Sequence, residues 1–501
     1  MQRTRRQRDP GRVFLAALAL LGTSGVALAA TPPPTVQLLR RADVASSSGP
    51  PTCTLSANPT SLPAGGSVPS TLTWSTTNAT RVTLNGGTVA PNGALTIQPL
   101  TDATYTLIAY GGPGTVSATC RQDVSVAQLP CVNGTICPVA CGTGMISDVA
   151  TGQLLTLDPQ HMVHVLILAE GYTLTDLSRF HLASRNDVAD WMDQWKRLDV
   201  YEAFQEAFCF WKLPAISNAR IIPGGTVEDT AFRVPVDASG NVDFSDAAAT
   251  AAVADRVWRE VAKLPFPPTS FYPTTASRTR GMAKTVVVAA MLYETARGAS
   301  GYSGTTALLQ NPSNASQTVA AAFSHNRPHE FSHAFARLRD EYVDLDGHAI
   351  CAPRSGAWNS GNVSNVACES TCADVPWSHL IAGGTINPSL GGLIGSFGHP
   401  EDGYHAELKC LMNGNRSDNA AVFGGEADLR DPERMCNFCR ELTVFRLFER
   451  IGRLNDTATS YASWQAVYRK PFYDAYGLDV PPAVPMETPP GRPVYAPCVS
   501  P

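Results

Sequence analysis

Two patterns of hydrophobic and polar positions divide the chain. Residues 52–128 hold short runs in which apolar and polar side chains alternate, and turns rich in Gly, Pro and Asn separate these runs. Alternation with a period of two is typical of strands that bury one face, so this segment is predicted to be a small all-β sandwich. In residues 151–455, apolar strand-like runs alternate with longer helical stretches. That second pattern predicts an α/β or α+β domain built on a mixed sheet, and hence a multidomain chain.

The second domain is expected to begin with a buried strand. Its predicted elements are a strand at 163–169, a long helical stretch at 174–208, a strand at 210–216, a helix near 246–262, a strand at 285–292 and a helix that carries the run HEFSH at 329–333. The last of these continues with apolar residues on one face, which predicts an amphipathic helix packed against the sheet.

The other segments differ from both domains in composition. Residues 1–30 combine five arginines, an apolar run and a small-residue Ala-Leu-Ala site, a pattern typical of a signal peptide. The Pro- and Ser-rich residues 31–51 predict a flexible spacer. Residues 129–150, with three cysteines, are interpreted as a linker, and the proline-rich residues 456–501 as an extended tail.

Composition narrows the class of protein. With 44% apolar and 16% charged residues in 501, the chain is globular, and a net charge of -5 without a basic block argues against nucleic acid as a partner. Beyond the signal segment, no apolar run reaches the roughly 18 residues of a membrane span. We therefore expect a monomer that is secreted, periplasmic or exposed at the cell surface, with no membrane span.

The thirteen cysteines all lie beyond the signal segment, which predicts disulfides formed in an oxidising compartment. Cys53 and Cys120 fall on the first and last strands of the predicted sandwich, so a disulfide between them is expected. Cys209 has the most apolar neighbours and is the candidate for an unpaired, buried thiol. Cys436 and Cys439 are expected to form disulfides with neighbours such as Cys410 rather than to bind structural zinc.

The run HEFSH carries the chemistry. On a helix, His329 and His333 lie roughly 40° apart around the axis and about 6 Å along it, so both imidazoles can reach one ion. Zinc suits this pair, and Glu330 is placed to take a proton from metal-activated water without binding the metal itself. The arrangement predicts a zinc peptidase that acts on protein or peptide substrates.

The segment HEFSHAFARLRDEY at 329–342 also resembles the signature of the immunoglobulin-A peptidase family of zinc metallopeptidases. VHVLILAEGYT at 163–173 is similar to that family's opening strand, and KCLMN at 409–413 with CNFCREL at 436–442 is similar to its methionine segment and Cys-x-x-Cys close. Ser332 stands where the family usually has glycine. The resemblance implies a metzincin-like catalytic domain that binds one zinc ion.

The alternating N-terminal segment has a resemblance of its own. WSTTNAT at 74–80 and TYTL at 104–107 are similar to bacterial immunoglobulin-like repeats. The resemblance implies an immunoglobulin-like domain in front of the peptidase domain.

The third zinc ligand is expected among the acids that follow the motif. The resemblance points to Asp340, with Glu341 as the alternative, while both acids could instead cap or solvate a helix end. A straight helix would carry Asp340 more than about 10 Å past His333, so the helix must end between them. No glycine marks such an end before Gly347.

Three further features of the catalytic domain carry hypotheses. The resemblance implies a tight turn with a methionine beneath the zinc; Met412 is our candidate and Met435 the alternative. Tyr404 or His405, in a polar segment just before that turn, could donate a hydrogen bond to the oxyanion. The acids of Asp344-x-Asp346-Gly347 are a candidate for a structural calcium ion, although the glutamate that ends a full calcium loop is missing.

These features together predict a secreted zinc metalloendopeptidase that hydrolyses peptide bonds of extracellular proteins. The alternative is a surface adhesin or binding module whose peptidase domain is degenerate, against which the intact His-Glu-His argues. Metal content and a casein digestion assay distinguish the two classes.

Overall fold

The computed structural model describes part of the chain. The described residues are 49–65, 68–112, 116–149, 151–183, 186–221, 229–235, 246–269, 285–293, 300–302, 306–311, 328–339, 341, 365–367, 372–373, 375–382, 394–395, 404–407, 410–413, 435–455 and 461–464. The chain divides into two compact units, 1–47 and 48–501. The predicted signal peptide lies outside the described residues, as does nearly all of the spacer and of the C-terminal tail.

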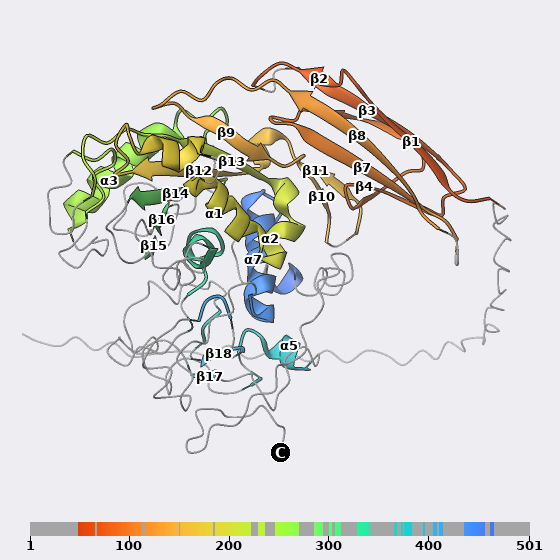
Figure 1. Cartoon of the computed structure of the whole chain (residues 1–501). Coiled ribbons are helices and arrows are strands. Elements are labelled where there is room, and N and C mark those ends of the chain that lie inside the picture. The colour runs from red at the N-terminus through yellow and green to blue at the C-terminus, as the bar shows by residue number, and fades with distance from the viewer. Residues whose placement is uncertain are drawn as a thin grey trace, which may run out of the picture. The chain divides into compact units, whose positions relative to one another are not determined.

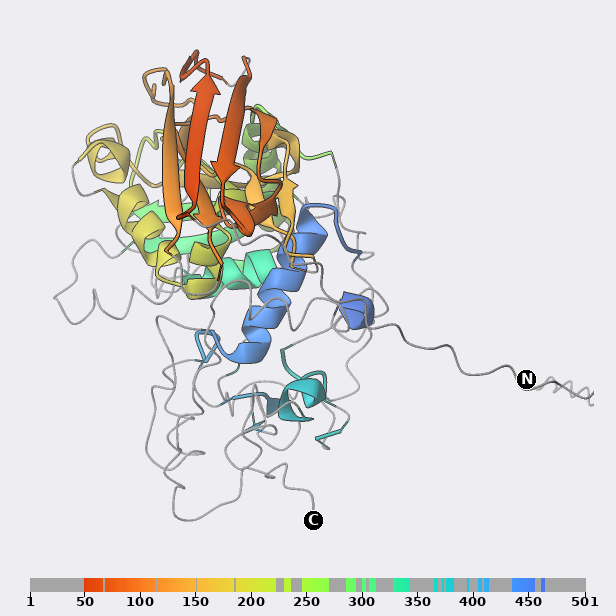
Figure 2. The ribbon, with the colours of Figure 1, turned by 90° about the vertical axis from the view of Figure 1, so that its right-hand side faces the viewer.

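The N-terminal strands form two sheets that share one hydrophobic core, as the alternating pattern predicts (Figure 2). The first sheet has the order β1-β3-β6 and consists of β1 (Thr52–Asn58), β3 (Ser70–Thr77) and β6 (Gly93–Ile97). The second has the order β2-β8-β7-β4-β5 and consists of β2 (Ser61–Leu62), β8 (Ala118–Val126), β7 (Ala103–Tyr110), β4 (Arg81–Leu84) and β5 (Gly87–Val89). Leu72, Tyr105 and Leu107 are fully buried between the sheets.

Three disulfides lie within the described residues. Cys53 on β1 is bonded to Cys120 on β8, so the predicted disulfide is confirmed and joins the two sheets of the sandwich. Cys131 is bonded to Cys137. The prediction that Cys209 is an unpaired thiol is wrong, because Cys209 is bonded to Cys141. Apolar neighbours indicated its burial correctly, but the strand register that sets Cys141 opposite Cys209 is a long-range contact.

Beyond the sandwich, the chain forms a six-stranded mixed sheet with the order β15-β16-β14-β12-β13-β9 (Figure 1). Its strands are β9 (Cys137–Cys141), β12 (Val163–Glu170), β13 (Phe208–Leu213), β14 (Val286–Tyr293), β15 (Ser300–Tyr302) and β16 (Thr306–Asn311). The four inner strands are parallel, and β9 and β15 are antiparallel edges. All eight residues of β12 are buried, as expected for a parallel strand covered on both faces.

Part of the segment interpreted as a linker belongs to this fold, because β9 lies within residues 129–150. The short strands β10 (Met145–Ser147) and β11 (Leu154–Thr156) then pair with each other. A bridge from Thr88 on β5 to Gln153 and a hydrogen bond from Asn85 Nδ2 to Thr143 Oγ1 tie the sandwich to these strands. The remaining short strands, β17 (Ile394–Gly395) and β18 (Tyr404–His405), form a two-stranded pair.

The longest helical stretch that the sequence pattern predicts is interrupted in the structure. The expected stretch at 174–208 is divided into η2 (Ser178–Leu182), α1 (Asp187–Lys196), α2 (Asp199–Ala203) and η3 (Gln205–Ala207). The division follows from local capping: the Asn186 side chain accepts from the Ala189 amide and starts α1, and Leu198 takes extended backbone angles before α2. The other helices among the described residues are η1 (Pro159–His161), α3 (Ala247–Val261), the segments 328–336 and 461–464, α5 (Ser378–Ala382) and α7 (Asn437–Arg450). None of the described helices is long and apolar enough to cross a membrane.

An aromatic cluster joins the helix at 328–336 to the sheet and to the helices beside it. Phe331 and Phe335 stack on each other and meet Trp195, Tyr201 and Phe208 at ring-centroid distances of 5.3 to 6.3 Å. These aromatic side chains lie about 200° around the helix from the histidines, because each residue turns the helix by about 100°. The helix therefore buries its aromatic face and leaves the opposite face for the histidines.

The sandwich disulfide gives a stability prediction. Replacing Cys53 and Cys120 by Ser reopens a loop of 67 residues and should lower the free energy of unfolding by about 4 kcal/mol. The matched control, Ser at Cys131 and Cys137, reopens a loop of only 6 residues and should cost about 2 kcal/mol. Scanning calorimetry measures both, and equal losses would contradict the loop-entropy explanation.

Candidate metal centre

The HEFSH segment is helical from residue 328 to residue 336, and its two histidines face the same point. The Nε2 atoms of His329 and His333 lie 3.1 Å apart, and the ring planes are 87° to each other. His329 Nδ1 bonds the carbonyl oxygen of Leu411 at 2.8 Å, and His333 Nδ1 bonds that of Leu338 at 2.6 Å. A carbonyl oxygen can only accept, so each Nδ1 carries the proton and each Nε2 presents a lone pair.

The two lone pairs test whether a zinc ion fits. In a tetrahedral site with zinc–nitrogen bonds of about 2.0–2.1 Å, two ligand nitrogens are separated by about 3.3 Å. The observed separation of 3.1 Å is close to that value. Backbone carbonyls that orient imidazole ligands through Nδ1 are also the usual surroundings of a zinc-binding histidine. The residues present therefore fit the ion.

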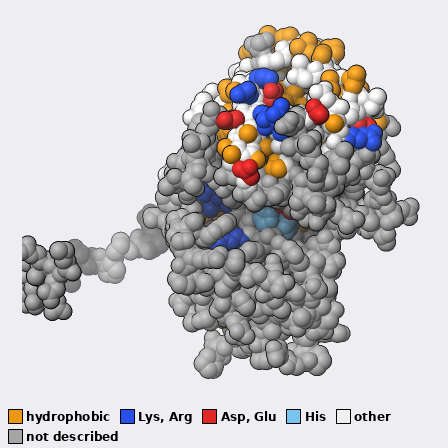
Figure 3. Space-filling view, turned by 90° about the vertical axis from the view of Figure 1, so that its left-hand side faces the viewer, with side chains coloured by type: hydrophobic (Ala, Val, Ile, Leu, Met, Phe, Trp, Pro, Cys, Tyr) orange, Lys and Arg blue, Asp and Glu red, His pale blue; other side chains and the backbone are white. Residues whose placement is uncertain are grey.

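Glu330 completes this group. One carboxylate oxygen of Glu330 lies within 4.8 Å of a ring nitrogen of each histidine, and the side chain is only 7% exposed. Both histidines are half-buried, so this face of the helix is partly open to solvent. Figure 3 shows histidine side chains reaching the surface in a recess on one face of the molecule, beside cationic side chains.

The helix ends before Asp340, as the third-ligand hypothesis requires. Ala336 is the last helical residue, and Arg337 adopts a left-handed backbone with a φ of 59°. The Arg337 amide still donates to the carbonyl of His333, which closes the last turn. A left-handed residue at this position is a common helix C-cap and is usually glycine, whereas an arginine stands here.

Arg450, the last residue of α7, caps the C-terminal end of the helix at 328–336. Its Nε donates to the Phe335 carbonyl and its Nη2 to the Ala334 carbonyl, each at 2.8 Å, and the side chain is 1% exposed. These carbonyls belong to the last turn, where a helix leaves acceptors without intrahelical partners and carries partial negative charge. Sequence reasoning missed Arg450, because only the fold brings α7 to this helix.

The backbone on both sides of Asp340 is held in place, although Asp340 itself lies outside the described residues. The Asn365 side chain accepts from the Arg339 amide at 2.8 Å and donates to the Arg339 carbonyl at 2.9 Å. The Glu341 amide donates to the Met412 carbonyl at 2.9 Å. Asn365, too, was missed, since nothing in its local sequence indicates these contacts.

Met412 lies in a tight turn next to the histidines. The Asn413 amide donates to the carbonyl of Cys410 at 3.0 Å, which closes a four-residue turn, and Met412 is fully buried within it. The turn also supplies Leu411, whose carbonyl orients His329. Met435, the alternative, is equally buried but lies against Thr443 of α7, with its sulfur 3.3 Å from the hydroxyl.

A second group of potential ligands is separate from the histidines. It consists of Glu341, Cys410, Cys436 and Cys439, each at most 1% exposed. The expectation that these cysteines form disulfides is wrong, because all three are free thiols. Glu341 therefore lies among sulfur atoms, and the histidine group does not include it.

Burial governs the titration of this second group. Burial and, after it, the charge of Cys410 raise the pKa of Glu341, hydrogen bonds from His405 and Asn365 partly offset them, and the net pKa is about 7. Burial also raises the pKa of Cys436 and of Cys439 well above the usual range. At Cys410 burial has the same tendency, but hydrogen bonds from the other two thiols outweigh it and lower the pKa.

Among the remaining residues singled out in the sequence, the structure describes the side chains of His405 and Ser332. His405 is fully buried with Nδ1 3.4 Å from Glu341 Oε2, so it faces the second group. Tyr404 lies on β18, but its side chain is outside the described residues. The calcium candidates Asp344 and Asp346 also lie outside them. Ser332 is buried and bonds the Tyr201 hydroxyl at 2.9 Å, which gives this serine a packing role on the helix.

Two comparisons with known proteins found no relative. No protein-family model matches the chain, and no curated protein matches it significantly. The geometry above therefore carries the functional argument.

The contact between Arg450 and the helix at 328–336, which we call the metal helix, is testable. Arg450→Met keeps an apolar chain of similar length but leaves the Ala334 and Phe335 carbonyls without these donors. The free energy of unfolding should fall by about 2–6 kcal/mol, because a buried polar group that loses its partner costs about 1–3 kcal/mol and two carbonyls lose theirs. The control Arg453→Met, an exposed site one turn on, should change it by less than about 0.5 kcal/mol. Urea unfolding measures both; a small effect at Arg450 would contradict the capping role.

Proposed function

We propose that the chain is a secreted zinc-dependent metalloendopeptidase that hydrolyses peptide bonds of extracellular proteins. One observation carries the proposal: the Nε2 lone pairs of His329 and His333 face each other at 3.1 Å while both Nδ1 protons are held by backbone carbonyls. Two such lone pairs repel unless a positive charge lies between them. Glu330 beside them supplies the base that a hydrolytic zinc site needs.

We further assign the chain to the immunoglobulin-A peptidase type of metzincin-like enzymes. The resemblance of residues 329–342 is the basis, and the turn with Met412 supports it, because this turn orients His329 through Leu411. The N-terminal sandwich is proposed to be a bacterial immunoglobulin-like domain that spaces the enzyme from a surface. Disulfides in both parts of the chain support a secreted location.

In the proposed reaction, a zinc ion held by His329, His333 and Asp340 would supply Lewis acidity that polarises the scissile carbonyl and acidifies water. Glu330 takes the proton from the attacking water and later delivers it to the leaving amine nitrogen. The Leu411 and Leu338 carbonyls keep both rings in the tautomer that presents Nε2. Tyr404 is the proposed donor to the oxyanion that develops on the substrate.

The base is tested by Glu330→Gln. Because Glu330 is proposed to move a proton without binding the ion, this variant should keep zinc at the histidines and lose at least about a hundredfold in turnover. The control Glu202→Gln makes the same change at an exposed position of α2 and should keep its activity. Turnover of a quenched fluorescent peptide together with metal analysis gives the result, and full activity of Glu330→Gln would refute the mechanism.

The third ligand is tested by Asp340→Asn. Loss of a group that merely supports a ligand typically weakens metal binding about 10–100-fold, so loss of a ligand itself should weaken it by more than about 100-fold. The readout is the zinc concentration that restores hydrolysis to the metal-free enzyme. Asp193→Asn, exposed on α1, is the control for loss of a carboxylate. Restoration of Asp340→Asn at the wild-type zinc concentration would exclude Asp340 as a ligand.

A further inference from the structure

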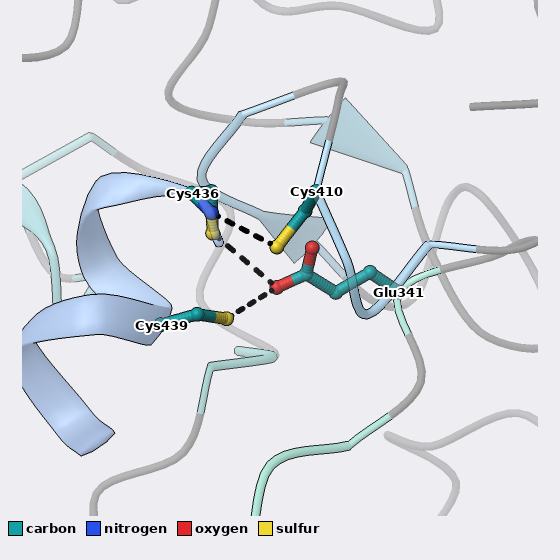
Figure 4. Close-up of side chains that lie close together, drawn as sticks. All are labelled: Glu341, Cys410, Cys436 and Cys439. Carbon is teal, nitrogen blue, oxygen red and sulfur yellow. Dashed lines mark hydrogen bonds between the residues drawn. The ribbon is translucent and has the colours of Figure 1, made fainter. Parts of the chain in front are cut away.

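Four buried side chains from three separate segments converge on one another (Figure 4). They are Glu341, Cys410, Cys436 and Cys439, and the potential ligand atoms all lie within 4.8 Å of one another. Cys439 Sγ is 3.1 Å and Cys436 Sγ is 3.8 Å from Glu341 Oε1. In a tetrahedral zinc site with bonds of about 2.3 Å to sulfur and 2.0–2.2 Å to oxygen, ligand atoms are about 3.5–3.8 Å apart. The two sulfur–oxygen distances lie close to this range, so the cluster is compact enough to surround one ion.

We propose that these four residues hold a second, structural zinc ion, bound by the three sulfur atoms and by Glu341 Oε1. Thiolate sulfur is a soft donor that selects zinc over calcium or magnesium, and four protein ligands without an open position are typical of structural zinc. Each thiol gives up its proton as it binds, so zinc binding releases protons and no oxidant or reductant takes part. The proposal is independent of the peptidase activity.

Local structure prepares the sulfur atoms for this role. Cys436 is the N-cap of α7, and Cys439 lies in its first turn, so the Cys-x-x-Cys spacing turns both sulfurs to the same side. The Cys436 amide points at Cys410 Sγ, 3.2 Å away. Thiolates are stabilised by helix N-termini because the partial positive charge of the amides lies there. Cys410 comes from the other side, at the start of the Met412 turn.

The Glu341 carboxylate is also held in position by neighbouring side chains. Asn365 Nδ2 donates to Glu341 Oε1 at 2.9 Å, and His405 Nδ1 lies 3.4 Å from Glu341 Oε2. Groups of this kind orient a metal-binding carboxylate from behind. A fully buried carboxylate needs nearby positive charge to offset its loss of hydration, and a divalent cation among the three sulfur atoms would add to what His405 can supply.

A disulfide explains this cluster less well than an ion. The seven other described cysteines are all disulfide-bonded, six of them in three pairs, whereas these three are thiols around a carboxylate. Three cysteines cannot all pair with one another. A bond between Cys436 and Cys439 would leave the Cys410 thiol and the Glu341 carboxylate buried without a shared counter-charge. One zinc ion satisfies all four groups at once.

The proposed ion would connect the segments that build the histidine site. Glu341 follows Asp340 directly, and its amide donates to the Met412 carbonyl. Cys410 precedes Leu411, whose carbonyl orients His329. Cys436 and Cys439 lie at the start of α7. Arg450, the last residue of α7, donates to a carbonyl of the metal helix. A cross-link among these segments would therefore fix the frame in which the catalytic ion is held.

The decisive experiment removes the first site and examines the second. His329→Ala/His333→Ala, purified without reductant or chelator, should retain about one zinc ion per chain, and the wild type about two. After cobalt replaces zinc, the variant should show the intense near-ultraviolet absorption of cobalt–thiolate charge transfer, which a site of nitrogen and oxygen ligands cannot produce. Because this variant is expected to be inactive in any case, the readout does not depend on the proposed function.

Two further measurements complete the test. Adding Cys410→Ser, Cys436→Ser and Cys439→Ser to this variant should remove the remaining zinc and the absorption band, whereas Cys53→Ser/Cys120→Ser should keep both. If the triple replacement fails to fold, alkylation of the wild type decides: the three thiols should react only after a chelator is added. A zinc-free histidine variant, thiols that react equally with and without chelator, or a mapped disulfide among the three would each overturn the proposal.

Discussion

The reversal of the chain after Ala336 is the constraint on which both ligand groups depend. Arg337 in its left-handed conformation ends the helix and brings the Leu338 carbonyl back to His333 Nδ1. Without that turn, His333 would lose the acceptor that fixes its tautomer. The same reversal lets Glu341 reach the cysteine group, which a continuous helix would prevent. Only a few residues therefore separate a half-open histidine group from a closed sulfur group.

The fully buried helix α7 provides the second support. All fourteen of its residues are buried, including charged ones, and a buried charge is tolerated only with partners. Arg450 finds them in the carbonyls at the end of the metal helix, and Glu441 finds them in His379 and in the Tyr461 hydroxyl. The polar side chains of α7 thus form directional hydrogen bonds at an interface that would otherwise be purely hydrophobic. Such bonds define the position of the metal helix more narrowly than apolar packing alone.

The sequence predicted those parts of the fold whose signal is local. The strands at 163–170 and 286–293 and the helix at 247–261 agree with expectation within one or two residues, because long apolar or amphipathic runs specify them. The His-Glu-His group was also predictable, since one helical turn creates it. Cys209, Arg450 and the cysteine cluster were not, because their partners lie far away in sequence. The helix was expected to end between His333 and Asp340, but no residue indicated where, because an arginine occupies the left-handed conformation for which glycine is usual.

The two ligand groups differ in the properties that separate a reactive metal site from an inert one. The histidines are half-buried and offer two nitrogens beside a carboxylate, so a coordination position can stay open to substrate. The cysteine group is closed on all sides and offers four ligands, so an ion there would have no position for a reactant. The turn that carries Met412 contributes to both groups, because its Leu411 carbonyl orients His329 and its Cys410 belongs to the cysteine group. Any restraint on the cysteine group therefore also restricts the histidine group. A rigid, closed site would then fix the backbone that orients His329, which is the support that the proposed catalytic geometry requires.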